Sequence, residues 1–161
     1  FNLSNTIDDI AASEPHDYYL DGAEWMRANV PAPQIIFNTD WDDFPRLFYY
    51  DPTHNYVSGL DPTYLFDKDP KLSKLYERIT LGEEEDPGPL IRERFGASYV
   101  FTDNHHDNFL NNAIESGWFD IVYEDTDCMI LRIRDVKGSP PLEELQPGDL
   151  PDDEPPPNEE P

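Results

Sequence analysis

The amino-acid sequence predicts an α/β fold: a small mixed sheet with an antiparallel edge hairpin, flanked by helices. Short apolar runs of strand length alternate along the chain with segments in which apolar residues recur at helical spacing. This alternation is typical of helices packed on a sheet. Late in the chain, two apolar runs are joined by a short acidic turn, which favours a hairpin. At 161 residues, the chain is long enough for one such domain.

The first helix is predicted at residues 15–29. Ser13 can cap this helix, and Pro15 is tolerated in a first helical turn. Its apolar residues recur at helical spacing, at Tyr19, Ala23, Met26 and Val30. Pro31 and Pro33 then end the helix.

A strand is predicted next, at residues 34–37, and a short helix follows it and runs to Tyr50. Asp42 or Asp43 can cap this helix, and Pro45 fits its first turn.

Residues 55–57 are predicted to form a short strand. Asp61-Pro62 and Asp69-Pro70 mark two further helix starts, the second of which leads to a helix reaching Gly82. The acidic run at residues 83–86 is most simply a solvated loop.

The last third contains a strand at residues 98–101, a helix that Gly117 can terminate, and two strands at 118–123 and 128–133. The helix has one apolar face, made of Phe109, Leu110, Ala113 and Ile114. Cys128 lies in the final apolar alternation and is expected to be a buried small hydrophobe.

Three segments are predicted along the chain. Residues 1–14 are interpreted as a linker, and residues 15–134 as the α/β domain. Residues 135–161 contain eight prolines and nine acidic residues with few aliphatic ones, a composition that predicts a disordered acidic tail.

The charge of the chain restricts its partners. The net charge is −24, and residues 1–134 carry 26 acidic and 10 basic residues, a charge of −16. Phosphate backbones and anionic lipid surfaces attract Lys and Arg. We therefore expect no nucleic-acid partner and no binding of the domain to a membrane surface, whereas cations, neutral sugars and basic peptides remain candidates.

The candidate substrate-binding residues are Trp41, Asp42, Asp43 and Asp61. The first three, together with Asp40, follow a predicted strand directly, and ligands of open α/β sheets bind beyond the carboxyl ends of strands. Helix capping alone can explain Asp42 or Asp43. The sequence therefore leaves a binding site and a simple helix cap as alternatives.

A metal site is not predicted, although a divalent cation is left open as a ligand. The carboxylates at residues 40–43 do not match the alternating ligands of an EF-hand loop. His105 and His106 are adjacent, and adjacent side chains on a helix point in different directions, so a two-ligand helical site is not expected. Their position at a predicted helix N-terminus favours an exposed structural role.

The segment at residues 41–66 is rich in aromatic side chains, which can stack on sugar rings but are expected mostly to form core. They are Trp41, Phe44, Phe48, Tyr49, Tyr50, Tyr56, Tyr64 and Phe66. No nucleophile, phosphate-loop or dinucleotide motif is present in the sequence, so no catalytic residue is predicted.

The order of several short motifs resembles the C-terminal extracytoplasmic domain of bacterial multi-pass membrane proteins of the GT-C glycosyltransferase class, similar to protein mannosyltransferases and other polyprenyl-phosphate-sugar enzymes. The motifs are Ala23-Glu24-Trp25, Asn29-Val30-Pro31, Ile35-Ile36-Phe37-Asn38, Trp41-Asp42-Asp43-Phe44-Pro45, Gly59-Leu60-Asp61-Pro62, Tyr99-Val100-Phe101 and the run from Trp118 to Asp125.

The resemblance implies a domain on the outer face of a cell membrane, with residues 1–14 as the linker from a preceding membrane segment. It also implies that the catalytic carboxylate lies in the membrane-spanning portion of the same protein. Trp41-Asp42 also resembles the tryptophan-aspartate motif with which oligosaccharyltransferases hold an acceptor peptide, although Phe44-Pro45 departs from that pattern. The expected function is therefore acceptor or sugar binding next to a catalytic site in the membrane-spanning portion. The alternative is a non-enzymatic acidic module that binds a cation or a basic partner.

Overall fold

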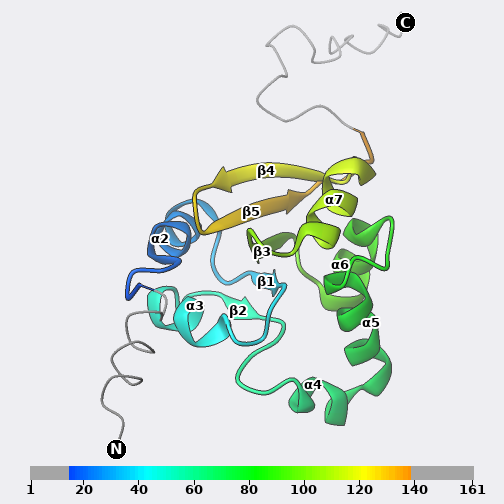
Figure 1. The fold of residues 1–161 in the computed structure, drawn as a ribbon, viewed down its shortest axis with the longest axis horizontal. Helices are drawn as coiled ribbons and strands as arrows, with labels where there is room; N and C mark the ends of the chain where they lie inside the picture. Colours follow the sequence, from blue (N-terminus) through cyan, green and yellow to red (C-terminus); the bar gives the residue numbers. More distant parts are fainter. Residues whose placement is uncertain (1–14, 139–161) are drawn as a thin grey trace, which may run out of the picture.

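A five-stranded mixed sheet forms the centre of the structure, a computed structural model that describes residues 15–138 (Figure 1). The strands are β1 (Ile35–Asn38), β2 (Asn55–Tyr56), β3 (Tyr99–Asp103), β4 (Phe119–Glu124) and β5 (Cys128–Ile133), in the order β2-β1-β3-β5-β4. β1 is parallel to β2 and β3, and β5 is antiparallel to β3 and β4. The predicted fold class, a mixed sheet with an antiparallel edge hairpin, is confirmed.

One face of the sheet is covered by α2 (Leu20–Asn29) and α3 (Phe44–Tyr50). The buried side chains of this layer come from both helices, from the two residues that flank α2 and from three strands; they are Tyr19, Ala23, Met26, Val30, Ile36, Leu47, Phe101, Cys128 and Ile130. Cys128 is fully buried, as predicted.

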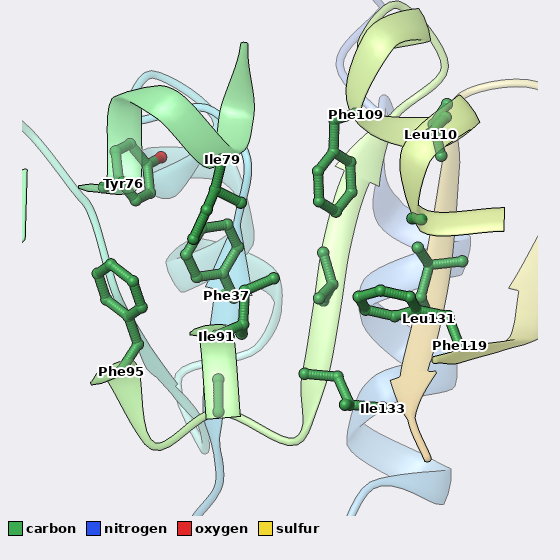
Figure 2. Close-up of a cluster of buried hydrophobic side chains, with 13 residues drawn as sticks. Phe37, Tyr76, Ile79, Ile91, Phe95, Phe109, Leu110, Phe119, Leu131 and Ile133 are labelled. Atoms are coloured by element: carbon green, nitrogen blue, oxygen red, sulfur yellow. The ribbon is translucent and has the colours of Figure 1, made fainter. Parts of the chain in front are cut away.

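The opposite face carries α5 (Pro70–Thr80), α6 (Pro87–Phe95) and α7 (Asp107–Ser116). Figure 2 shows the buried cluster between these helices and the sheet, in which Phe37 packs against Phe95 and Tyr76, while Phe109 lies near Phe119. The sheet is therefore buried on both sides, which explains why its central strands are continuous apolar runs. The short helix α4 (Thr63–Lys68) has no buried residue and precedes α5.

Most predicted elements match the structure, with two differences. The first helix begins at Leu20 instead of residue 15, because Tyr19 has a left-handed backbone (φ 70°) that interrupts helical geometry. Helix α6 was not predicted, although Pro87 stands in its first turn and Gly96 (φ 70°) ends it.

The edge hairpin is closed by the predicted turn. Asp125 Oδ1 accepts hydrogen bonds from the amides of Asp127 and Cys128, both at 2.8 Å. Across β4 and β5, Asp120 accepts a hydrogen bond from Arg132 and one from Arg134, each at 2.7 Å. These pairs fix the register of the hairpin on its polar side.

The predicted linker at residues 1–14, including Ser13, and residues 139–161 of the predicted tail lie outside the described residues. Residues 135–138 are described, and Lys137 Nζ lies 2.7 Å from Asp86 Oδ1. Within residues 15–138, none of the helices is both long and apolar enough to cross a membrane.

Candidate functional site

The candidate site lies where β1 and β3 end side by side. The chain leaves β1 toward α3 on one face of the sheet and leaves β3 toward α7 on the other face. Parallel strands whose connections diverge in this way leave a crevice at their carboxyl ends, which is the usual ligand site of open α/β sheets. This arrangement brings residues 39–43 and 103–106 together.

Hydrogen bonds hold both strand ends in place. The buried Asn38 side chain donates to the carbonyls of Asp40 (2.6 Å) and Ser58 (2.7 Å), and the Tyr76 hydroxyl donates to the Asn38 carbonyl (2.8 Å). Thr39 Oγ1 and Thr102 Oγ1 are 2.9 Å apart and link the ends of β1 and β3. The loop that carries the candidate residues therefore begins on a rigid base.

A cavity of about 490 Å³ opens beside these strand ends. Its walls combine hydroxyl and carboxyl groups with two exposed aromatic rings, Trp41 and Phe66. The lining residues come from both strand ends and from the α4–α5 region: Thr39, Asp40, Trp41, Pro62, Thr63, Phe66, Ser73, Tyr76, Glu77, Thr80, Leu81 and His106. Such a size and mixture suit a small ligand.

Asp40, Asp103 and His106 form a cluster in which one ligand atom of each lies within 4.8 Å of the others. His106 Nδ1 is 2.9 Å from Asp103 Oδ1, and His106 Nε2 is 4.0 Å from Asp40 Oδ2. Asp103 is buried, and Asp40 and His106 are half-buried. These donors are able to hold a metal ion.

The cluster shifts the pKa values of its own members. A hydrogen bond to Asp103 raises the pKa of His106, and the charges of Asp103 and Asp40 add to this effect, whereas burial opposes it. Burial alone would raise the pKa of Asp103, but hydrogen bonds from His106 and the His105 amide outweigh burial and lower it. Asp103 is therefore an ionised acceptor that orients the imidazole.

Asp43 is the most unusual carboxyl group of the site. Its side chain makes no capping hydrogen bond at the start of α3, so the capping interpretation is wrong for this residue. It is only 6% exposed, and its Oδ2 has no hydrogen-bond partner. Burial raises the pKa of Asp43 to about 7; a hydrogen bond from Tyr19 opposes the shift and the charges of Asp103 and Asp40 reinforce it.

The other predicted site residues are placed differently. Trp41 lines the cavity and is 41% exposed. Asp42 is mostly exposed; the small buried part of its side chain and a hydrogen bond to Asp40 raise the pKa of Asp42. Asp61 is exposed and does not line the cavity; its carboxylate accepts a hydrogen bond from the Thr63 amide at 2.8 Å. The structure thus brings Trp41, Asp42 and Asp43 together at one strand end and gives Asp61 a local role at the start of α4.

The expectation that most aromatic residues of segment 41–66 form core is wrong. None of the eight is buried, and Phe48, Tyr49, Tyr64 and Phe66 are each more than half exposed. They lie on the short helices α3 and α4, on the loops beside them and, for Tyr56, on the two-residue edge strand β2. Such short elements bury little area. The aromatic residues of this segment therefore lie at or near the protein surface.

Asp103 and His106 were not predicted as site residues. His106 was assigned an exposed structural role because His105 and His106 cannot act together on one helix face. In the structure, His105 is exposed and His106 turns toward Asp40 of another strand end. The available signal was the polar run Asp103–His106 directly after a predicted strand, the same signal that identified Trp41 and its neighbours.

Comparison of the chain with protein-family models, with curated proteins and with solved structures found no match.

Proposed function

We propose that this domain binds a neutral, hydroxylated ligand, a sugar or a hydroxylated acceptor, as an accessory domain of a membrane glycosyltransferase-like protein. The observation that carries the proposal is the cavity at the ends of β1 and β3, where Trp41 and Phe66 stand beside hydroxyl and carboxyl groups. The glycosyltransferase assignment depends on the order of sequence motifs described above. Catalysis is assigned to the membrane portion of that protein.

The chemistry of the cavity favours a sugar over an anionic ligand. A pyranose has apolar faces that pack on aromatic rings and hydroxyl groups that donate to carboxylates. Among its described lining residues, Asp40 and Glu77 are acidic, and none is Lys or Arg. A phosphate or carboxylate ligand would be repelled by this charge, whereas sugar hydroxyls would be bound.

The proposal is tested by measuring the affinity of the chain for simple neutral glycans and for Ser- or Thr-containing peptides. Calorimetry and tryptophan fluorescence measure this affinity. Trp41→Ala is expected to weaken binding by about fivefold or more, since an aromatic contact contributes about 1 kcal/mol or more. Tyr49→Ala is the matched control, because Tyr49 is 80% exposed and lies outside the cavity lining. Absence of binding by every ligand, or equal binding by wild type and Trp41→Ala, would refute the proposal.

The glycosyltransferase assignment has its own test in the full-length protein. Replacing Trp41 and Asp42 together by Ala is expected to abolish sugar transfer while leaving the domain folded, as judged by circular dichroism of the isolated chain. Unchanged sugar transfer by the double variant would show that Trp41 and Asp42 have no role in transfer.

A second candidate function is a non-enzymatic acidic module that binds a cation or a basic partner. It is favoured by the charge of −24 and by the cluster of Asp40, Asp103 and His106. A basic peptide that binds in a strongly salt-dependent manner, with no glycan binding, would favour this candidate over the first.

A further inference from the structure

We propose that Asp40 and His106 bind one divalent transition-metal cation, such as Mn²⁺ or Zn²⁺, at the crevice between the ends of β1 and β3, with Asp103 orienting the His106 imidazole. The inference rests on the cation-binding candidate function and deepens it by naming the ligand atoms and the class of metal. It concerns the chain alone and requires no sugar. Its failure is therefore distinguishable from failure of sugar binding.

The distances within the cluster suit a bound cation. His106 Nε2 and Asp40 Oδ2 are 4.0 Å apart, and metal–nitrogen and metal–oxygen bonds of zinc sites are about 2.0–2.2 Å. A cation between these two atoms would contact both with only a small closure of the side chains. A carboxylate oxygen of Asp103 lies within 4.8 Å of a ligand atom of each of the other two residues, so its charge adds to the attraction for the cation.

The hydrogen bonds prepare His106 as a ligand. Asp103 Oδ1 accepts from His106 Nδ1 at 2.9 Å and from the His105 amide at 2.7 Å. A proton held on Nδ1 leaves the lone pair of Nε2 directed away from Asp103, on the side of Asp40. Metal-binding histidines are commonly oriented by a carboxylate in this way. Asp103 therefore orients the imidazole through Oδ1, and Asp40 is the carboxylate placed near Nε2 to share the cation with His106.

A second observation also points to a ligand at this place. Among residues 15–138, two buried side-chain atoms lack a hydrogen-bond partner, Asp43 Oδ2 and Asn104 Oδ1. Both are oxygens, and they belong to the two segments that form the cluster, residues 39–43 and 103–106. Asp43 is 6% exposed, and the charges of Asp40 and Asp103 both act on its carboxyl group. Unpaired buried oxygens are costly and attract a positive group.

The described part of the chain supplies no basic side chain that would neutralise the cluster by an ion pair. The ion pairs of Asp40 and Asp103 within residues 15–138 are those with His106. A cation from solution would reduce the repulsion among Asp40, Asp43 and Asp103. The imidazole selects a transition metal, because Ca²⁺ and Mg²⁺ prefer oxygen ligands alone.

The test is calorimetric titration of the EDTA-treated chain with MnCl₂ and with ZnCl₂, without sugar. One ion per chain is expected, with weaker binding of Ca²⁺ and Mg²⁺. Asp40→Asn and His106→Ala are each expected to lower the affinity by at least about tenfold, since even residues that only orient ligands cost 10–100-fold. The two variants probe the site from opposite strand ends, and circular dichroism checks that each is folded.

His105→Ala is the matched control, because His105 is adjacent to His106, exposed and outside the cluster. Unchanged affinity in His105→Ala, together with Mn²⁺ broadening of the amide resonances of residues 39–43 and 103–107, would support the site. The inference is overturned if neither metal binds, if Asp40→Asn and His106→Ala bind as tightly as wild type, or if His105→Ala alone loses the metal.

Discussion

At the scale of single residues, the structure separates three neighbouring aspartates that the sequence presents as one acidic run. Asp40 faces the crevice and His106, Asp42 is exposed, and Asp43 is buried with one unpartnered oxygen. A buried carboxylate without full pairing lowers stability. Asp43 is therefore a residue whose presence costs stability, which is typical of functional sites.

Replacing Asp43 by Asn is expected to stabilise the metal-free chain. Asn has nearly the same shape and carries no charge, so the free energy of unfolding in EDTA should rise by about 1–3 kcal/mol. Urea denaturation measures this change. Asp42→Asn, at an exposed neighbour, is the control and should change stability by less than about 0.5 kcal/mol. A less stable Asp43→Asn chain would contradict the account of this residue.

Asp120 is expected to make the stability of the chain fall at acidic pH. Burial would raise its pKa, but hydrogen bonds from Arg132 and Arg134 outweigh burial and lower the pKa. A lowered carboxyl pKa stabilises the fold above the unfolded value of about 3.9, and this contribution is lost as pH falls through the folded pKa.

Asp120→Asn should accordingly cost about 1.5–3 kcal/mol at pH 7 and less at pH 3, which lies below the unfolded pKa of about 3.9. Denaturant unfolding at the two pH values measures the difference. Glu24→Gln, on the exposed side of α2, provides the comparison. A loss of equal size at both pH values would mean that Asp120 contributes by packing and not by its charge.

At the scale of elements, α2 contacts the sheet closely through Gly22. A Cβ atom added at Gly22 would lie 2.5 Å from Cys128 Sγ and 3.5 Å from a ring carbon of Tyr123. Gly inside a helix normally costs about 1 kcal/mol relative to Ala. Its presence in α2 is explained by the short distance between this helix and β5.

Gly22→Ala is therefore expected to destabilise the chain by about 1–3 kcal/mol in spite of the better helix propensity of Ala, because overpacking a core has a cost of this size. Thermal unfolding measures the change. Removing the thiol should relieve the clash, so Gly22→Ala should cost less in a Cys128→Ala background than in wild type. Additive effects of the two substitutions would show that the contact is not responsible.

The elements themselves were largely predictable because each has a local signal. The strand at Ile35–Asn38 begins with three apolar residues in a row, and Asp69 caps α5 by accepting from the amides of Lys71 and Leu72. The start of α2 was missed because a left-handed Tyr19 has no sequence signal comparable to that of Gly. Helix α6 was missed because its Pro-Gly-Pro start is also typical of a turn.

The site was only half predictable, for a different reason. Sequence position identifies polar residues after each strand, but not which strands are neighbours. Thr39 and Thr102 are 63 residues apart and meet because β1 pairs with β3. The same pairing places His106 beside Asp40, so this contact depends on sheet order and not on any local motif.

At the scale of the whole molecule, the net charge of −24 is expected to lower stability at low ionic strength. Repulsion among many like charges disfavours a compact state, and salt screens it within about 10 Å at 0.1 M. The melting temperature should therefore rise by about 3 °C or more between 0.02 M and 1 M NaCl. A neutral osmolyte at matched osmolality is the control, and a melting temperature that falls with salt would contradict this expectation.

The crevice at the ends of β1 and β3 is the proposed binding site of the domain. Amide chemical shifts of the ¹⁵N-labelled chain, titrated separately with neutral glycans, hydroxylated peptides and Zn²⁺, provide the decisive test. We expect perturbed resonances to concentrate at residues 39–43 and 103–106, with those of α4 and α5 that line the cavity. Perturbations confined to other surfaces, or none with any of these ligands, would contradict it.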